Sequence, residues 1–281
     1  MTSQKQRAET FQALHQAPHL FALPNVWDPG SAVIAQQAGF ESIATTSAGV
    51  AFTFGYPDGQ HLPVAELTRW VGAMARRISI PLSVDMERGY AEDVSGVRSH
   101  VRSVIRAGAV GINLEDGIPG ARPRLDDLEL CREKIQGLTQ LKTEMDIPFV
   151  INARTCAFLL GIGDPEERLA LAIDRCNAFA QAGADCVFVP GLTRESDIDT
   201  LVKHVDAPVN LLLHPHTADL ARMEALGIRR LSLGSAAVRA VQAHLMAMMN
   251  QLKKDNDPRP FLDHELDYAR ANALFNRSVE D

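Results

Sequence analysis

The strongest constraint on the fold is a repeated way in which the chain passes from a helix into a buried strand. In four segments an amphipathic run ends at a glycine, and an apolar run begins four residues later; these glycines are Gly39, Gly108, Gly183 and Gly227. Glycine suits the left-handed position just beyond a helix end. A continuous apolar run is typical of a strand that is buried on both faces. Each segment therefore predicts a helix followed by a parallel strand.

A second kind of strand start alternates with the first. Pro81, Pro148 and Pro208 each open an apolar run, at the position in a strand where a missing N–H does least harm. With one more strand at residues 19–27, the chain has eight strands separated by segments of helical periodicity. This alternation predicts an α/β protein with a closed parallel (β/α)8 TIM barrel. The alternative is an open doubly wound sheet, but no glycine-rich phosphate motif follows the first strand.

The length of the chain fits one such barrel. It has 281 residues, and barrels commonly take about 250 residues in one domain. We therefore expect a single domain over residues 1–281. Residues 257–281 continue after the eighth predicted helix with a helical pattern, which indicates a C-terminal helical extension that covers the barrel floor or docks on a neighbouring subunit.

Charge and composition limit the partners. The formal net charge is −7 and no dense basic run occurs, which argues against nucleic acid as a partner. No stretch approaches the roughly 20 apolar residues of a membrane span, and the polar N-terminus lacks the core of a signal peptide. The four cysteines form no CxxC pair. We therefore expect a cytoplasmic protein with reduced thiols and no membrane association.

Three acidic residues indicate a metal site. Active sites of parallel barrels lie at the carboxyl ends of the strands. Asp85 and Glu87 are two apart on the third strand, so they share a face, and Glu115 ends the fourth strand. Three converging carboxylates repel one another without a cation, and oxygen ligands suit Mg²⁺. The alternative is that arginines satisfy these acids: Arg88, Arg122 and Arg124.

An arginine and a run of small residues indicate an anion site. Arg154 ends an otherwise apolar strand, where it needs an anion. That anion is either a substrate carboxylate held by two hydrogen bonds, or Glu115 or Glu87 in a salt bridge. Residues 45–49 are small and offer free backbone N–H groups, which suit a carboxylate or an oxyanion.

Four ordered motifs resemble one known family. PNVWDPGSAVIAQQAGFESIATTSAGVAFTFGYPD, LSVDMERGY, GINLEDG and VINART follow one another within residues 20–160, and together they resemble the phosphoenolpyruvate mutase/isocitrate lyase superfamily. The resemblance implies a (β/α)8 barrel whose eighth helix is exchanged between the subunits of a homodimer or homotetramer. It implies Mg²⁺, with Mn²⁺ as a substitute, on Asp85, Glu87 and Glu115.

The resemblance also implies where a small carboxylate substrate lies. Its carboxylate would contact Thr46, Ser47 and Ala48, with Arg154 assisting, and Asp58 in the GYPD motif matches an acid near the active site. The strand ends add further candidates for substrate binding, namely Trp27 and Asn210. The candidates for delivering a proton are Tyr90, His214 and a metal-bound water.

The sequence departs from the family pattern at positions that distinguish one reaction of the family from another. The isocitrate lyases carry a cysteine-containing loop shortly after the fourth-strand acids, but residues 117–127 read GIPGARPRLDD and have no Cys, Lys or His. The gating loop of the mutases is absent as well. The glycines and prolines of this loop predict a lid, which would bring Arg122 and Arg124 towards a bound acid. In the third strand, Glu87 replaces an aspartate and Ala91 a glycine.

These features predict a Mg²⁺-dependent lyase acting on a small 2-oxo or 2-hydroxy di- or tricarboxylate. Carbon–carbon cleavage and decarboxylation both pass through an enolate, which positive charge stabilises, and the sequence does not choose between them. One alternative is carbon–phosphorus chemistry on phosphonopyruvate. The other is a catalytically silent barrel that binds a metabolite or a protein.

Overall fold

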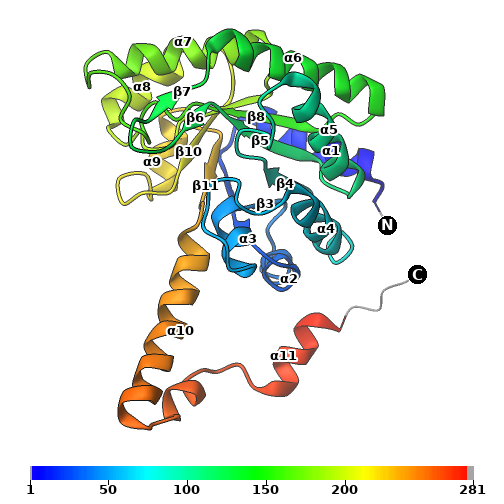
Figure 1. Cartoon of the computed structure of the whole chain (residues 1–281), viewed down its shortest axis with the longest axis vertical. Helices are drawn as coiled ribbons and strands as arrows, with labels where there is room; N and C mark the ends of the chain where they lie inside the picture. The colour runs from blue at the N-terminus through cyan, green and yellow to red at the C-terminus, as the bar shows by residue number, and fades with distance from the viewer. Residues whose placement is uncertain (1, 277–281) are drawn as a thin grey trace.

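The computed structural model describes residues 2–276, and its central element is a parallel sheet that closes into a barrel (Figure 1). The strands of this sheet are β1 (Phe21–Leu23), β2 (Asn25–Val26), β3 (Ile43–Thr45), β4 (Leu82–Asp85), β5 (Gly111–Glu115), β8 (Val150–Arg154), β9 (Cys186–Phe188), β10 (Val209–Leu212) and β11 (Arg230–Ser232). β1 and β2 are two halves of one strand, separated by Pro24, which has no N–H for a ladder. Because β1 pairs with β11 and β2 with β3, the sheet closes on itself. The predicted (β/α)8 barrel is confirmed.

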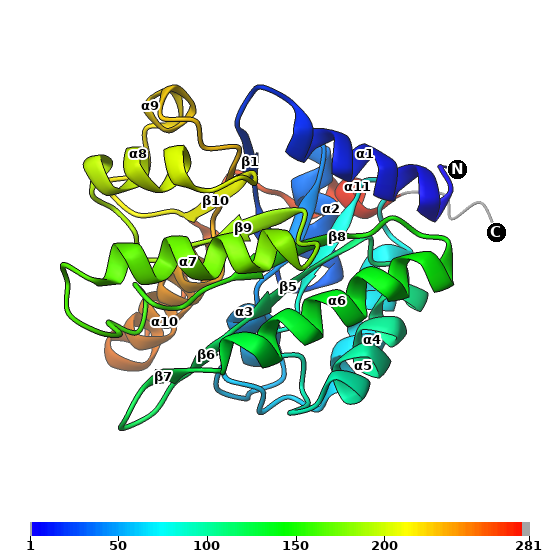
Figure 2. The ribbon, with the colours of Figure 1, turned by 90° about the horizontal axis from the view of Figure 1, so that it is seen from above.

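Helices alternate with the strands and surround the barrel (Figure 2). They are α1 (Gln4–Gln16), α2 (Pro29–Gln37), α3 (Ser47–Thr53), α4 (Val64–Ala75), α5 (Val94–Arg106), α6 (Leu128–Met145), α7 (Arg168–Gln181), α8 (Glu195–His204), α9 (Leu220–Ala225), α10 (Ala236–Asp255) and α11 (Tyr268–Phe275), with a short 3₁₀ helix η1 (Arg259–Leu262). No helix within residues 2–276 is long and apolar enough to cross a bilayer.

The local sequence explains where these elements begin and end. In α5 the Asp93 side chain accepts a hydrogen bond from the Gly96 N–H and caps the helix, and a valine stripe including Val97 and Val101 faces the core. All four glycines that were predicted to follow helix ends have positive φ, for example 116° at Gly108. This confirms the prediction that a left-handed glycine follows each of these helix ends.

Helix α1 covers the floor of the barrel. Its Phe11 packs so closely against β5 that a Cβ atom on Gly111 would lie 2.6 Å from the Phe11 ring. Phe11, Ala8 and inward-facing residues of the strands form a small core of their own. The C-terminal extension therefore does not cover the floor, which was one of its two predicted positions.

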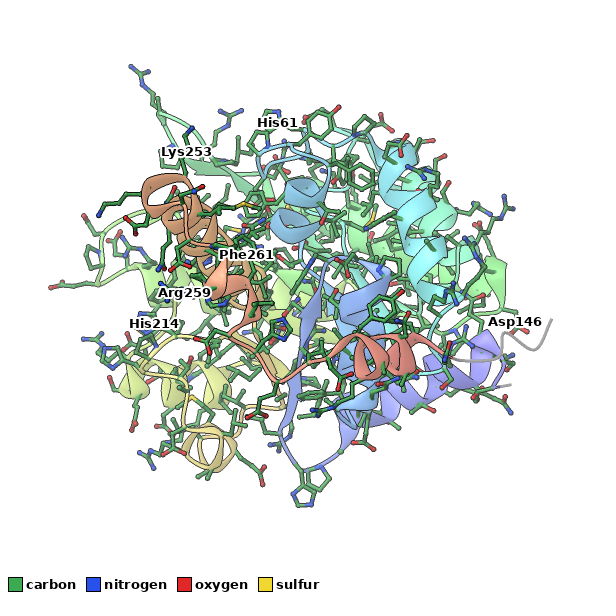
Figure 3. The ribbon with its side chains drawn as sticks, turned by 90° about the horizontal axis from the view of Figure 1, so that it is seen from below. His61, Asp146, His214, Lys253, Arg259 and Phe261 are labelled. Atoms are coloured by element: carbon green, nitrogen blue, oxygen red, sulfur yellow. The ribbon has the colours of Figure 1, made fainter. Side chains whose placement is uncertain are left out.

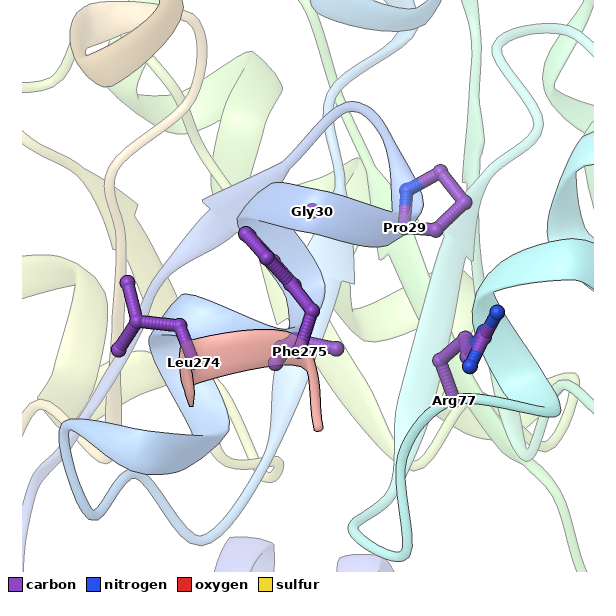
Figure 4. Close-up of a pocket in the computed structure, with 6 residues that line it drawn as sticks. Pro29, Gly30, Arg77, Leu274 and Phe275 are labelled. Atoms are coloured by element: carbon purple, nitrogen blue, oxygen red, sulfur yellow. The ribbon is translucent and has the colours of Figure 1, made fainter. Parts of the chain in front are cut away.

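The C-terminal segment instead leaves the barrel and returns to its side. α10 projects away from the barrel, and Val238 is its one buried residue (Figure 1). α11 lies against α2, where Leu274 and Phe275 face Pro29 and Gly30 (Figure 4). A helix was predicted in residues 257–281; it occupies Tyr268–Phe275, and residues 277–281 lie outside the described part.

A buried histidine in α1 contacts a buried arginine at the floor. The His15 Nδ1 lies 2.8 Å from the Phe11 carbonyl oxygen, and its Nε2 lies 3.5 Å from Nη1 of Arg230. Since arginine only donates, Nε2 accepts and Nδ1 carries the proton. Burial, together with the positive charge of Arg230, lowers the pKa of His15 to about 3.

We expect His15→Asn to remove a pH dependence of the stability. The unfolded chain takes up a proton on His15 below about pH 6.5, whereas the folded chain does not until about pH 3. This residue therefore lowers the free energy of unfolding by about 1.4 kcal/mol for each pH unit below 6.5. Urea unfolding of both proteins at pH 6.5 and 5.0 measures the difference in slope. Equal slopes would contradict the prediction.

Candidate active site

Two adjoining cavities open at the carboxyl ends of the strands and share Asp58, Arg154 and Leu159. The first, called here the Asp85 cavity, has a volume of about 210 Å³. The second, the Glu115 cavity, has a volume of about 290 Å³. Most of the predicted site residues line one or both: Thr46, Ser47, Ala48, Asp58, Asp85, Glu87, Glu115 and Arg154.

Asp85 is a buried carboxylate without an ion-pair partner. It ends β4 and is 8% exposed. Its Oδ1 accepts a hydrogen bond from the Glu87 N–H at 3.2 Å, and its Oδ2 accepts one from the Ser47 N–H at 3.4 Å. Within residues 2–276, no Lys, Arg or His forms an ion pair with it. Backbone N–H groups are its hydrogen-bond donors, and the charges of Arg154 and Arg230 act on it without direct contact, which leaves the carboxylate able to bind a cation.

Glu87 and Asp58 add to the negative charge around Asp85. The Oε1 of Glu87 accepts hydrogen bonds from the Gln60 N–H at 3.1 Å and the Tyr90 hydroxyl at 3.0 Å. Burial, together with repulsion from Asp85 and other acids, raises the pKa of Glu87 to about 8. Burial also raises the pKa of Asp58, again with a contribution from Asp85. The carboxylates therefore favour a proton or a cation among them.

Glu115 and Arg154 form an ion pair between the two cavities. The Nη1 of Arg154 lies 2.8 Å from Oε2 of Glu115. Burial raises the pKa of Glu115 to about 7, although Arg154 opposes the shift. The Arg154 Nε is buried and has no hydrogen-bond partner in the described part of the chain. Of the two predicted partners of Arg154, the structure contains the salt bridge to Glu115.

The donor set fits Mg²⁺. In residues 2–276, no three His, Cys, Asp or Glu side chains already lie close enough together to hold a metal ion. Mg²⁺ is commonly held by one or two carboxylates and keeps several waters, so a preformed group of three is not required. Asp85 offers an uncompensated carboxylate, and Glu87 and Glu115 line the adjoining cavity.

The small-residue run forms the start of α3 and one wall of the Asp85 cavity. Thr46 caps this helix, and Ser47 and Ala48 form its first turn. A Cβ atom on Gly49 would lie 2.6 Å from Cγ2 of Thr46 and 2.9 Å from Cβ of Trp27. The glycine lets α3 pack on Trp27, which therefore supports this wall from behind.

Other predicted residues lie outside both linings. Trp27 lies behind α3, and Asn210 is buried below the cavity, where it exchanges hydrogen bonds with Ser232. Tyr90 contacts Glu87 instead of the cavity. His214 is exposed in the loop after β10 (Figure 3).

The predicted lid is a hairpin. β6 (Gly117–Ile118) and β7 (Arg124–Leu125) pair in antiparallel fashion, and the hairpin projects outward (Figure 2). Arg122 and Arg124 are exposed and line neither cavity. A Cβ atom on Gly117 would lie 2.7 Å from Sγ of Cys156. Gly117 thus serves close packing at the base of the hairpin.

Several cavity residues were not selected from the sequence, namely Gln60, Asn113, Cys156, Leu159 and Phe188. The two-residue period of a strand carries the signal for some of them. Asn113 lies two residues before Glu115, and Cys156 two residues after Arg154. The Cys156 thiol lies 3.7 Å from Glu115 Oε2, and burial raises its pKa. No such signal marks Gln60 or Leu159, because both lie in loops.

A barrel whose strand ends gather carboxylates and an arginine around a cavity has the architecture of a (β/α)8-barrel enzyme site. Residues 11–253 match the model of the family described as phosphoenolpyruvate phosphomutase. The chain belongs to this family, and the superfamily predicted from the four motifs is confirmed.

Individual relatives agree with this assignment. The chain is 32% identical over 226 residues to an uncharacterised protein of Mycobacterium tuberculosis H37Rv, covering 80% of this chain and 82% of that protein. It is 27% identical to 2-methylisocitrate lyase of Bacillus subtilis, covering 74% and 67%. A solved structure of phosphonopyruvate hydrolase with oxalate and Mg²⁺ matches with a TM-score of 0.82 and 26% identity, covering 95% and 94%.

Proposed function

We propose that this protein is a Mg²⁺-dependent lyase that cleaves a carbon–carbon bond in, or decarboxylates, a small 2-oxo or 2-hydroxy acid. One observation carries the proposal: Asp85 is a buried carboxylate at a cavity, and no ion pair compensates it within residues 2–276. A bound divalent cation would supply positive charge beside the oxygen that becomes negative as the bond breaks. Asp85, Glu87 and Glu115 would hold Mg²⁺ or Mn²⁺.

The residues of the chain would bind and orient the acid. The start of α3, at Thr46, Ser47 and Ala48, would receive one carboxylate, and the Arg154 guanidinium, which lines the same cavity, would donate to it. Asp58 borders both cavities. Its position makes it our candidate for moving a proton at the reacting carbon.

The rest of the lining narrows the substrate class. One wall of the Asp85 cavity is apolar and consists of Leu159, Phe188, Pro190 and Leu212. The other cationic lining residue, Arg88, already pairs with Asp126 at 2.7 Å. Arg154 also pairs with Glu115, but it is the cation that lines both cavities. With this single shared cation, the site favours a dicarboxylate with an apolar substituent over a tricarboxylate.

A substrate screen tests the proposal. Alkyl-substituted dicarboxylates, unsubstituted dicarboxylates and tricarboxylates are incubated with and without Mg²⁺, and pyruvate, glyoxylate and carbon dioxide are measured. We expect metal-dependent product from a dicarboxylate, and none with Asp58→Asn. If the protein binds one of these acids but turns over none of them, the result would instead favour the catalytically silent barrel.

Carbon–phosphorus chemistry is the second candidate. It is supported by the match to phosphonopyruvate hydrolase, while the sequence lacks the gating loop of the mutases. Release of inorganic phosphate from phosphonopyruvate, faster than any lyase reaction, would favour this candidate over ours.

The β6–β7 hairpin is proposed to close over a bound acid. In the outward position Arg122 and Arg124 line neither cavity, and an inward movement of the hairpin would bring them towards the substrate. Replacing both with alanine should then raise KM for a dicarboxylate about tenfold and leave kcat unchanged.

We expect the protein to form a homodimer or homotetramer through residues 236–275. α10 projects from the barrel and exposes Val241, Leu245, Met246 and Met249, an apolar surface that a single chain leaves uncovered. Light scattering at micromolar concentration measures the mass. A monomer would contradict the prediction, and Met246→Glu with Met249→Glu should convert the oligomer to monomers.

A further inference from the structure

Three residues with unusual backbone conformation meet beside the site. Gln60, Glu87 and Tyr90 have φ of 62°, 47° and 57°, and they are three of the five non-glycine residues with positive φ that the described chain contains. Such conformations are disfavoured and persist where surrounding contacts hold them, often at functional sites. Gln60 is 27 residues from Glu87 in sequence, so contacts between two separate loops hold this group together.

A closed set of hydrogen bonds joins the three residues. The Gln60 N–H donates to Oε1 of Glu87 at 3.1 Å, and the Tyr90 N–H donates to Oε1 of Gln60 at 2.7 Å. The Tyr90 hydroxyl donates to the same Glu87 oxygen at 3.0 Å. Gln60 thus uses both its backbone and its side chain. Both of these hydrogen bonds to the Glu87 carboxylate fall on Oε1, which leaves Oε2 for a cation or water.

This cluster fastens the loop that carries Asp58. Residues 54–63 connect α3 to α4, and the loop is largely exposed around Asp58. Asp58 lies two residues before Gln60 and borders both cavities. The turn after β4, which holds Glu87 and Tyr90, is the neighbouring element to which Gln60 ties this loop.

We propose that Gln60 is a positioning residue that latches the 54–63 loop to the Glu87–Tyr90 turn and so holds Asp58 at the junction of the two cavities. The catalytic consequence rests on the proposed lyase function, but the latch itself does not. The arrangement also gives a reason for Glu87 where the family pattern has aspartate, because the longer side chain reaches the loop.

Amide hydrogen exchange of Gln60→Ala tests the latch without any substrate. Alanine keeps the strained backbone but removes the acceptor for the Tyr90 N–H, and Gln60→Gly repeats the test without backbone strain. We expect exchange in residues 54–62 to be about tenfold faster than in the wild type, with the thermal midpoint nearly unchanged. The exposed neighbour His61→Ala is the matched control and should exchange as the wild type. Unchanged exchange in both Gln60 variants would overturn the latch.

Kinetics test the consequence for Asp58. On an acid turned over by the wild type, Gln60→Ala should lower kcat about tenfold, since small misplacements of a reacting group are costly, and change KM less than twofold. A purely structural defect would instead lower the active fraction together with the thermal midpoint. Faster exchange with unchanged kcat would show a latch that does not position Asp58. If no acid is turned over by the wild type, the proposed function fails while the exchange result still decides the latch.

Discussion

Asp85→Ala should abolish Mg²⁺ binding and lower any lyase activity at least about 100-fold while the barrel stays folded. Asp85 is the buried carboxylate at the Asp85 cavity for which residues 2–276 provide no ion-pair partner. In the metal-free protein its removal should raise the thermal midpoint, since it relieves the repulsion of Glu87 and Asp58, whose pKa values Asp85 raises. Mg²⁺ at 100 times its Kd should stabilise the wild type by about 2.7 kcal/mol and the variant not at all.

Two control variants separate charge from shape. Asp85→Asn keeps the size of the side chain and should lose metal binding as fully as the alanine variant. Glu133→Gln removes an exposed charge on α6, at a residue that lines neither cavity. This variant should bind metal as the wild type does. Calorimetry and thermal unfolding, each with and without Mg²⁺, provide the measurements. Unchanged metal affinity in Asp85→Ala would contradict the assignment of this residue as a metal ligand.

The fold was predictable because its signals are local. A glycine after each of four helices and a proline before each of three strands mark the repeat, and each of these residues acts through its own backbone conformation. The break of the first strand at Pro24 was not predicted, because it depends on pairing with two different neighbours. The direction of α10 was not predictable either, since a helix periodicity says nothing of where the chain goes next.

The candidate site was predictable only where the strand period applies. Asp85 and Glu115 end their strands, as the sequence predicted, and line adjoining cavities. Glu87 was predicted to share a strand face with Asp85, but it lies beyond β4 with a φ of 47° and lines the Glu115 cavity. His214 lies in a loop, and no period fixes where a loop side chain points. Gln60 is the opposite case, a loop residue whose role depends on contacts with residues 27 and 30 positions away.

Neighbouring acids in the sequence have different environments in the structure. Adjacent residues of a strand point to opposite faces, so Glu115 borders a cavity while Asp116 points towards α7. Asp116 is 1% exposed, and its Oδ2 lies 2.6 Å from Nε of Arg175. Its Oδ1 accepts a hydrogen bond from the Cys156 N–H at 2.8 Å. The Arg175 Nη2 donates to the carbonyl of Asp126 at 2.9 Å.

We therefore expect Asp116→Ala and Arg175→Ala each to lower the free energy of unfolding by about 3–5 kcal/mol, because each leaves a buried charge without its partner. The pair connects α7 to the residues that follow β8 and β7, so its loss weakens the packing around the strand end that carries Arg154.

Replacing both residues with apolar ones of similar size, Asp116→Leu with Arg175→Met, should destabilise the protein less than either alanine change. Urea unfolding of the single and double variants measures these differences in stability. Arg222→Ala is the control, since it breaks an exposed pair with Glu195 of nearly the same length, 2.7 Å, and should change stability little. If Asp116→Ala destabilises no more than Arg222→Ala, the buried pair does not hold these segments together.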